Sequence, residues 1–179
     1  MILSFYDQPG GVETERGNRV LYDLERDEAY FGAARVEGHV LRWELGHDPE
    51  PEARLAAEVE LNSDRGWIVR CDRIDFPPGG IAYTHTHPGP GIRCLLFGSI
   101  RIESGGDTNE YGTLEPWFES GPEPVYATVS ETQPTAFVRV MLLPREWEGK
   151  RTIRYVDPAD EEKPKLQRAT VFFDRPLEP

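Results

Sequence analysis

From about residue 28 onward, apolar and polar side chains alternate with a period of two along most of the chain. Successive side chains of a β-strand point to opposite faces of a sheet, so this alternation is typical of strands with one buried face. The segments between the alternating runs are short and rich in glycine and proline, of which the chain holds 17 and 16. These residues favour tight turns and interrupt long helices. The sequence therefore predicts about ten short strands in an all-β sandwich or barrel.

The alternation and the intervening turns also locate the expected strands. They span residues 29–36, 39–45, 54–61, 67–76, 81–87, 92–97, 99–104, 124–130, 136–143, 151–157 and 168–174. The segments 54–61 and 67–76 flank a stretch of turn-forming residues, so we expect these two strands to form a hairpin. Residues 103–112 have the composition of a loop.

The two ends of the chain depart from this pattern. Residues 1–27 are charged and weakly patterned, and we expect an N-terminal arm or a partly ordered extension there. Residues 28–179 are expected to form one β-barrel domain, and residues 157–165 a solvated linker before the last strand. The strands ahead of residue 77 are more than a minimal barrel needs, so we expect them to extend a sheet that pairs across a homodimer.

Charge and hydropathy exclude several classes of partner. The chain has 20 Lys and Arg against 32 Asp and Glu, a formal net charge of −12. Nucleic acid and anionic membrane surfaces would repel such a protein. No apolar stretch approaches the ~18 residues of a membrane span, and the first residues lack the pattern of a secretory leader. We therefore expect a cytoplasmic protein with no nucleic-acid or membrane partner.

The chain contains two cysteines, Cys71 and Cys94, and both lie inside apolar alternating runs. Such positions are typical of buried, reduced thiols. A single disulfide between the two residues is the alternative.

Two of the four histidines, His85 and His87, lie two residues apart on an expected strand. Both imidazoles therefore leave the sheet on one face, and we expect Ile81 and Tyr83 on that face as well. Two imidazoles on one side can ligate the same divalent ion. The other two histidines lie at strand ends and are expected at the surface.

The residues around this pair resemble the first motif of the cupin superfamily, G-x5-H-x-H-x3,4-E-x6-G. Its matching positions are occupied by Gly79, His85, His87 and Gly98. Gly91 stands where the family has a metal-ligating glutamate. Residues 112–127 are an approximate counterpart of the second motif, with Pro124 in place of its ligating histidine. The resemblance implies a cupin-type double-sheet jelly-roll barrel with its core in residues 77–143 and extra N-terminal strands.

The resemblance also implies a metal site, of which His85 and His87 are half of the usual three-histidine, one-glutamate set. Because first-row metals normally take three or more protein ligands, we look for a carboxylate in residues 112–127. Glu119 is the first candidate and Glu123 the second. The expected ion is Fe, Mn, Ni or Zn. The alternative is that the histidines line a metal-free pocket and that Glu119 caps a turn or pairs with an arginine.

Arg93 shares the alternation of Gly91 and Leu95, so we expect its side chain inside the barrel. A buried guanidinium is costly unless an anion meets it. Either Arg93 pairs with an internal acid such as Glu119, or it holds a carboxylate or phosphate of a ligand beside the histidines. Arg139 is either a second inward arginine or an outward one.

Two functions are consistent with these residues. The first is an atypical divalent-metal-dependent enzyme of the dioxygenase, isomerase or lyase type, acting on a small anionic metabolite. In that enzyme Arg93 would orient the anionic end of the substrate and Tyr83 would assist proton transfer. The second is a non-catalytic, metal-free cupin that binds or senses a small ligand. The substrate does not follow from the resemblance, because cupins host many chemistries on one fold.

Overall fold

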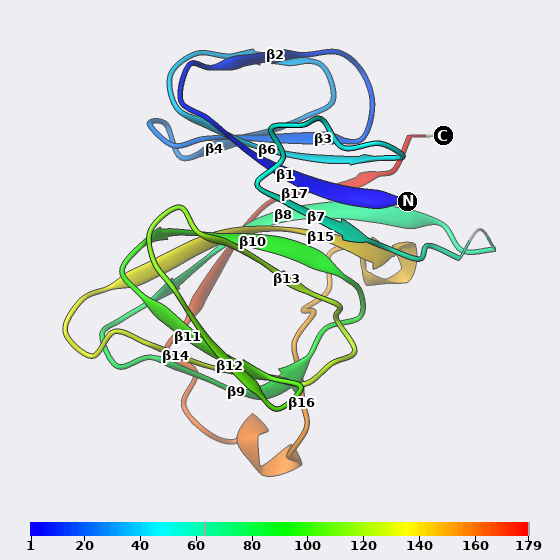
Figure 1. Ribbon diagram of the computed structural model, residues 1–179. Coiled ribbons are helices and arrows are strands. Elements are labelled where there is room, and N and C mark those ends of the chain that lie inside the picture. Colours follow the sequence, from blue (N-terminus) through cyan, green and yellow to red (C-terminus); the bar gives the residue numbers. More distant parts are fainter. Residues whose placement is uncertain (63, 179) are drawn as a thin grey trace.

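The computed structural model describes residues 1–62 and 64–178 and is built almost entirely of β-strands, which confirms the all-β prediction (Figure 1). Most of these strands belong to three five-stranded sheets. Within the described residues, the helical elements are two short 3-10 turns, η1 (Arg145–Trp147) and η2 (Pro158–Glu161). No helix in this part of the chain is long and apolar enough to cross a membrane.

The first sheet is built from the N-terminal strands, in the order β4-β3-β6-β1-β7. Its members are β1 (Ile2–Gln8), β3 (Arg19–Asp23), β4 (Glu28–Phe31), β6 (Val40–Gly46) and β7 (Leu55–Glu58). A separate two-stranded ribbon, β2 (Val12–Thr14) with β5 (Ala34–Val36), lies at the top of Figure 1.

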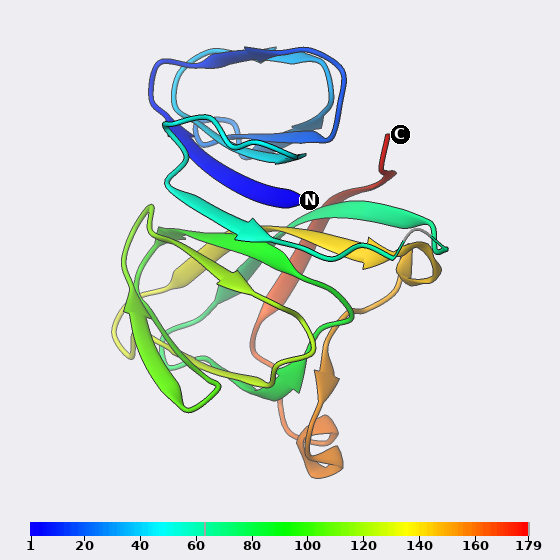
Figure 2. The same cartoon turned by 45° about the vertical axis from the view of Figure 1, so that its right-hand side comes forward.

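The other two sheets face each other and form the barrel (Figure 2). The middle sheet has the order β13-β10-β15-β8-β17, and its members are β8 (Trp67–Phe76), β10 (Gly91–Phe97), β13 (Pro116–Glu119), β15 (Thr135–Pro144) and β17 (Arg168–Pro176). The far sheet has the order β12-β11-β14-β9-β16, and its members are β9 (Ile81–Thr86), β11 (Ile100–Ser104), β12 (Asp107–Tyr111), β14 (Val125–Val129) and β16 (Arg154–Tyr155).

The central strands of the middle sheet are covered on both faces. Cys94 and Val138 on its outer face pack against the N-terminal sheet, whereas Leu95 and Phe137 on its inner face line the barrel core. Every residue of β15 is buried as a result. Neighbouring residues of a strand point to opposite faces of a sheet. The polar residues that alternate with the apolar residues of the outer face are therefore directed into the barrel.

The expectation that residues 1–27 form an arm is wrong. The segment supplies β1 and β3 to the N-terminal sheet, and Leu3, Phe5 and Tyr22 are each at most 1% exposed. Its strands do carry alternate apolar residues. The charges that obscure this pattern lie largely in the turns between the strands, such as the turn 24–27.

Several strand pairings also differ from expectation. Strand β7 pairs with β1, and β8 pairs with β15 and β17, so the predicted hairpin of 54–61 with 67–76 is wrong. The segment 29–36 divides into β4 and β5 at Gly32, whose φ is 77°. The expected loop 103–112 contains β12, which returns along β11. A local alternation identifies a strand but does not select its partner.

The cysteine prediction is confirmed, since Cys71 and Cys94 are buried and unbonded. Both side chains lie in the apolar cluster between the N-terminal and middle sheets. Burial raises the pKa of both thiols, so neither is a reactive thiolate.

The homodimer stays a prediction, but its original reason is removed. The surplus N-terminal strands bury their apolar face against the outer face of the middle sheet of the same chain. They therefore need no second copy to cover that face.

Phe5 tests how strongly the barrel depends on the N-terminal sheet. Its side chain is 0% exposed, and its ring centroid lies 5.0 Å from that of Trp43, whose Nε1 donates a hydrogen bond to the Ile92 carbonyl in the middle sheet. Replacing Phe5 with Ala should lower the free energy of unfolding by about 3–5 kcal/mol in equilibrium urea unfolding, because it leaves a cavity. Val156→Ala, at a side chain that is 55% exposed, should stay within about 0.5 kcal/mol. Equal effects of the two substitutions would contradict this dependence.

Candidate functional site

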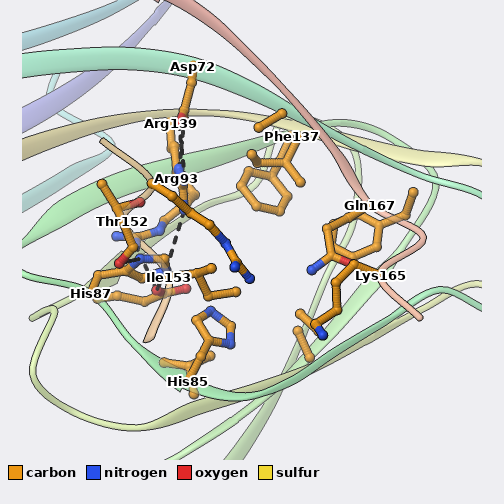
Figure 3. A pocket seen from close by; sticks show the side chains of 18 of the residues that line it. Asp72, His85, His87, Arg93, Phe137, Arg139, Thr152, Ile153, Lys165 and Gln167 are labelled. Carbon is orange, nitrogen blue, oxygen red and sulfur yellow. Dashed lines mark hydrogen bonds and ion pairs between the residues drawn. The ribbon is translucent and has the colours of Figure 1, made fainter. Parts of the chain in front are cut away.

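A cavity of about 650 Å³ lies inside the barrel, a size suited to a small organic ligand. One part of its wall is apolar and includes Ile74, Phe76, Ala82, Ile100, Ile102, Val125, Ala127 and Phe137. A polar end is formed by Asp72, His85, His87, Arg93, Glu119 and Arg139. Most of the remaining wall comes from the strap, which we define as residues 149–167. Figure 3 shows Arg93 and Arg139 entering from one side, with Lys165 and Gln167 of the strap on the other.

Both histidines point into this cavity, as their spacing predicts, with ring centroids 4.9 Å apart. Nδ1 of His85 lies 2.7 Å from the Tyr83 carbonyl oxygen, and Nδ1 of His87 lies 3.3 Å from that of Thr152 in the strap. A carbonyl oxygen can only accept a hydrogen bond, so each Nδ1 carries the proton and donates it. Nε2 of each ring is then a lone-pair acceptor.

The two imidazoles are neutral at pH 7. Burial lowers the pKa of His85 below its ordinary value. Burial also lowers the pKa of His87 well below that value, and the positive charges of Arg139 and Arg93 add to the effect. A low dielectric and nearby cations both disfavour a protonated ring.

Tyr83 does not line the cavity, and its expected place beside the histidines is wrong. In the pairing of β9 with β14, Val125 lies opposite His85 and Ala127 lies opposite Ala82, so three steps along β9 match two along β14. This extra residue is a β-bulge, and it reverses the alternation ahead of the histidines. Ala82 therefore faces the cavity, whereas the ring of Tyr83 lies 4.6 Å from Nζ of Lys163.

Arg93 points into the barrel, as predicted, and its side chain is 1% exposed. Its Nη1 donates to the Gly91 carbonyl at 2.7 Å, and its Nη2 lies 2.7 Å from Oε2 of Glu119. The other oxygen of Glu119 accepts a hydrogen bond of 2.8 Å from Nε1 of Trp117. The internal pairing of Arg93 with Glu119 is therefore present.

This pairing does not use the whole guanidinium. The contact between Nη2 and Glu119 lacks hydrogen-bond geometry, and Nη2 is buried without a hydrogen-bond partner among the described residues. Burial lowers the pKa of Arg93 to about 10, while the charge of Glu119 opposes that shift. Arg93 is thus still a cation at neutral pH, and it has an N–H group to offer.

Gly91 has no room for the glutamate of the cupin motif. A Cβ atom there would lie 2.4 Å from the Val140 carbonyl oxygen and 3.0 Å from Cα of Met141, both on β15. Gly91 is also directly opposite Glu119 in the pairing of β10 with β13. The carboxylate of the polar end therefore comes from the neighbouring strand.

Arg139 is inward, and its partner is Asp72, a residue that the sequence analysis does not single out. Nε and Nη2 of Arg139 donate to the two oxygens of Asp72 at 2.6 and 3.0 Å. Nη1 of Arg139 lies 3.4 Å from Nε2 of His87. Asp72 points to the opposite face of β8 from Cys71, and both residues are buried because this part of the sheet is covered on both faces.

The donor set does not fit a metal ion. Nε2 of His87 and Oε2 of Glu119 are 4.0 Å apart, but Arg93 and Trp117 already engage Glu119, and Arg139 approaches His87. A divalent ion at this end would also be repelled by two buried guanidinium groups. Glu123, the second candidate ligand, is exposed and outside the cavity lining. In residues 1–62 and 64–178, no group of three His, Cys, Asp or Glu side chains is placed to hold an ion.

No known protein family and no curated protein matches this sequence. Parts of the chain are similar to solved structures, among them the polyketide cyclase RemF of Streptomyces resistomycificus, with a TM-score of 0.40 and 23% identity over 49% of this chain and 61% of that one. An RmlC-like cupin of Shewanella frigidimarina has a TM-score of 0.38 and 17% identity over 44% and 68% of the two chains. The DMSP lyase DddQ of Ruegeria pomeroyi has a TM-score of 0.43 and 16% identity over 56% and 57%.

These similarities concern the fold alone. Cupin proteins are among the similar structures. The chain spans 61% of the length of the cyclase and 57% of that of the lyase.

Removing the guanidinium of Arg93 should turn the polar end into a metal site. Arg93→Ala would free Glu119 to join His85 and His87 and would remove a repulsion of about 3 kcal/mol per unit charge, for charges ~5 Å apart at an effective dielectric of 20. We expect Co²⁺ or Zn²⁺ to bind this variant roughly 100-fold more tightly than the unaltered protein, measured by calorimetry or cobalt absorption. The double variant Arg93→Ala/Glu119→Gln should lose this gain in metal affinity, because it lacks the third ligand. Stoichiometric, tightly held metal in the unaltered protein would contradict the expectation.

The buried histidines should make the protein less stable as the pH falls. Their pKa values are below 6.5 in the folded chain, so between about pH 7 and 5 the unfolded chain binds protons that the folded chain does not. At pH 5.5 this proton binding lowers the free energy of unfolding by up to about 1.4 kcal/mol per histidine relative to pH 7.5. Urea unfolding at the two pH values should show the loss, and His85→Gln/His87→Gln should reduce it. The exposed His47 provides the control, because His47→Gln should leave the loss unchanged.

Proposed function

We propose that the protein binds a small organic carboxylate in the barrel cavity, with Arg93 as the anchor and without a resident metal ion. The observation that carries the proposal is the charge of the cavity lining. Seven cationic side chains and three carboxylates line it, although the chain as a whole has a net charge of −12. The cations are Arg70, Arg93, Arg139, Lys150, Arg151, Lys163 and Lys165.

Carboxylates neutralise part of this charge but not all of it. Asp72 and Glu119 pair with the two inward arginines, and Glu161 pairs with Arg151. Asp174 and Asp160, outside the lining, pair with Arg70 and Lys163. A cavity with an excess of positive charge and low-dielectric walls concentrates anions relative to the surrounding solvent.

Arg93 is the best anchor for the carboxylate because it is fully buried and its Nη2, although in an ion pair with Glu119, makes no hydrogen bond of normal geometry. A ligand oxygen at Nη2 would satisfy an N–H group that otherwise lacks a hydrogen bond. Nε2 of His85 and His87 are acceptors, so they do not compete for the anion. The apolar wall around Phe137 would hold the body of the ligand.

The metal-dependent enzyme has less support from the same residues. Its third ligand is engaged in an ion pair with Arg93, and its proposed proton-transfer residue, Tyr83, lies outside the cavity lining. The metal-free binding protein requires neither feature. We therefore propose the binding function for this chain.

A matched pair of probes tests this function. By calorimetry, 3-phenylpropanoate should bind, and 3-phenylpropan-1-ol, which lacks the negative charge, should bind at least about tenfold more weakly. The variant Arg93→Met/Glu119→Gln removes the anchor without leaving a buried carboxylate unpaired. It should weaken binding of 3-phenylpropanoate by roughly 10–100-fold.

Arg101→Met serves as the control, because Arg101 is exposed on β11 and outside the lining. It should leave binding of the acid unchanged. Equal binding of acid and alcohol, or an undiminished affinity in the double variant, would overturn the proposed function.

A further inference from the structure

Two buried polar atoms of the cavity lining make no hydrogen bond of normal geometry within the described residues, although one of them, an arginine nitrogen, contacts the Glu119 carboxylate at 2.7 Å. They are Nη2 of Arg93 and Oε1 of Gln167. Figure 3 shows that the two side chains approach the cavity from different walls, Arg93 from the polar end and Gln167 from the strap. A buried donor or acceptor that makes no hydrogen bond is costly. Each of them therefore marks a place where a polar ligand atom is expected.

Gln167 is held in place by the elements that flank it. It directly precedes β17, whose first residue, Arg168, pairs with Asp75 of β8. On its other side the strap is fixed to the barrel through the pairing of Tyr155 with His85. Arg70 adds hydrogen bonds of 2.6 and 3.2 Å to the carbonyl oxygens of Lys150 and Trp147. The amide is thus presented from a fixed backbone, which suits recognition.

The two lysines of the strap that precede Gln167, Lys163 and Lys165, are already engaged. Nζ of Lys163 lies 2.5 Å from Asp160 and over the ring of Tyr83. Nζ of Lys165 donates to the carbonyl oxygens of Glu161 and Lys163 at 2.6 and 2.7 Å. Near Gln167 the strap therefore offers the ligand an acceptor, Oε1 of Gln167, while the ammonium groups of Lys163 and Lys165 are held by other partners. The complementary ligand group is a neutral hydrogen-bond donor.

We infer that the ligand is a carboxylic acid with an apolar body and a hydroxyl or N–H group at its far end, which donates a hydrogen bond to Oε1 of Gln167. The inference rests on the proposed function, because it takes Arg93 as the partner of the carboxylate. The apolar wall between the two ends, with Ile74, Val125 and Phe137, matches the body of such a molecule.

Pairs of probes that differ by one hydroxyl test the inference. We would compare phenylacetate, 3-phenylpropanoate and 4-phenylbutanoate with their 4-hydroxyphenyl counterparts by calorimetry, so that the hydroxyl is presented at three distances from the carboxylate. For the spacer that fits, the hydroxyl should tighten binding about 3–10-fold, the effect of one net hydrogen bond. Gln167→Met, which keeps the length of the side chain and removes the amide, should abolish this preference and change binding of the parent acid by less than about twofold.

Gln8 provides the matched control. Its Oε1 is also buried without a partner, but Gln8 is on β1 and outside the cavity lining. Gln8→Met should leave the preference for the hydroxyl intact.

The outcomes separate this inference from the proposed function. If no acid binds, the proposed function fails, and the inference fails with it. If the acids bind through Arg93 but the hydroxyl has no effect at any spacer length, only the inference is overturned. If 4-methoxyphenyl acids bind more tightly than hydroxyphenyl acids, Gln167 donates through its Nε2, and the assignment of a donor to the ligand is overturned.

Discussion

The central strands of the middle sheet, β8, β10 and β15, are largely buried on both faces, and the character of the site depends on this constraint. The N-terminal sheet covers one face and the barrel encloses the other, so alternate residues of these strands enter the barrel interior. Any charged residue among them must find a partner inside the protein. Arg93 and Arg139 meet Glu119 and Asp72 for this reason, and these pairs set the polarity of one end of the cavity.

The same ion pairs determine which chemistry the polar end of the cavity can perform. Asp72, Arg139 and His87 form a chain of contacts that reaches the Thr152 carbonyl of the strap, so β8, β15, the residue that follows β9 and the strap share one network. Burial keeps both histidines neutral, the charges of the two guanidinium groups add to this effect at His87, and Arg93 occupies the carboxylate that an ion would need. A buried guanidinium thus supplies the positive charge that a metal ion would supply at the polar end of the cavity. It offers a ligand N–H groups in fixed directions, whereas a metal ion offers open coordination positions.

Strand alternation was enough to predict the all-β fold, the shared face of His85 and His87, and the inward position of Arg93. It failed where the direction or the burial of a side chain depends on something other than the alternation within its own strand. The bulge in β9 moved Tyr83 away from the histidines, and nothing in the alternation marks that extra residue. Asp72 was hidden because a sheet with two covered faces buries polar and apolar residues alike. Gln167 lies beside a stretch with the composition of a linker, and only the fold brings it to the cavity.

The close packing at Gly91 limits how a site of this kind can change by mutation. The atoms that exclude a side chain there include the Val140 carbonyl oxygen and Cα of Met141, and main-chain atoms cannot be removed by mutation. A single substitution that restores the motif glutamate would meet this obstacle whatever the rest of the cavity contains. The strands β10 and β15 would first have to separate, at the expense of the sheet that supports both arginines. The departure from the metal-binding motif is therefore self-sustaining, since the backbone around the glycine makes the reverse step costly.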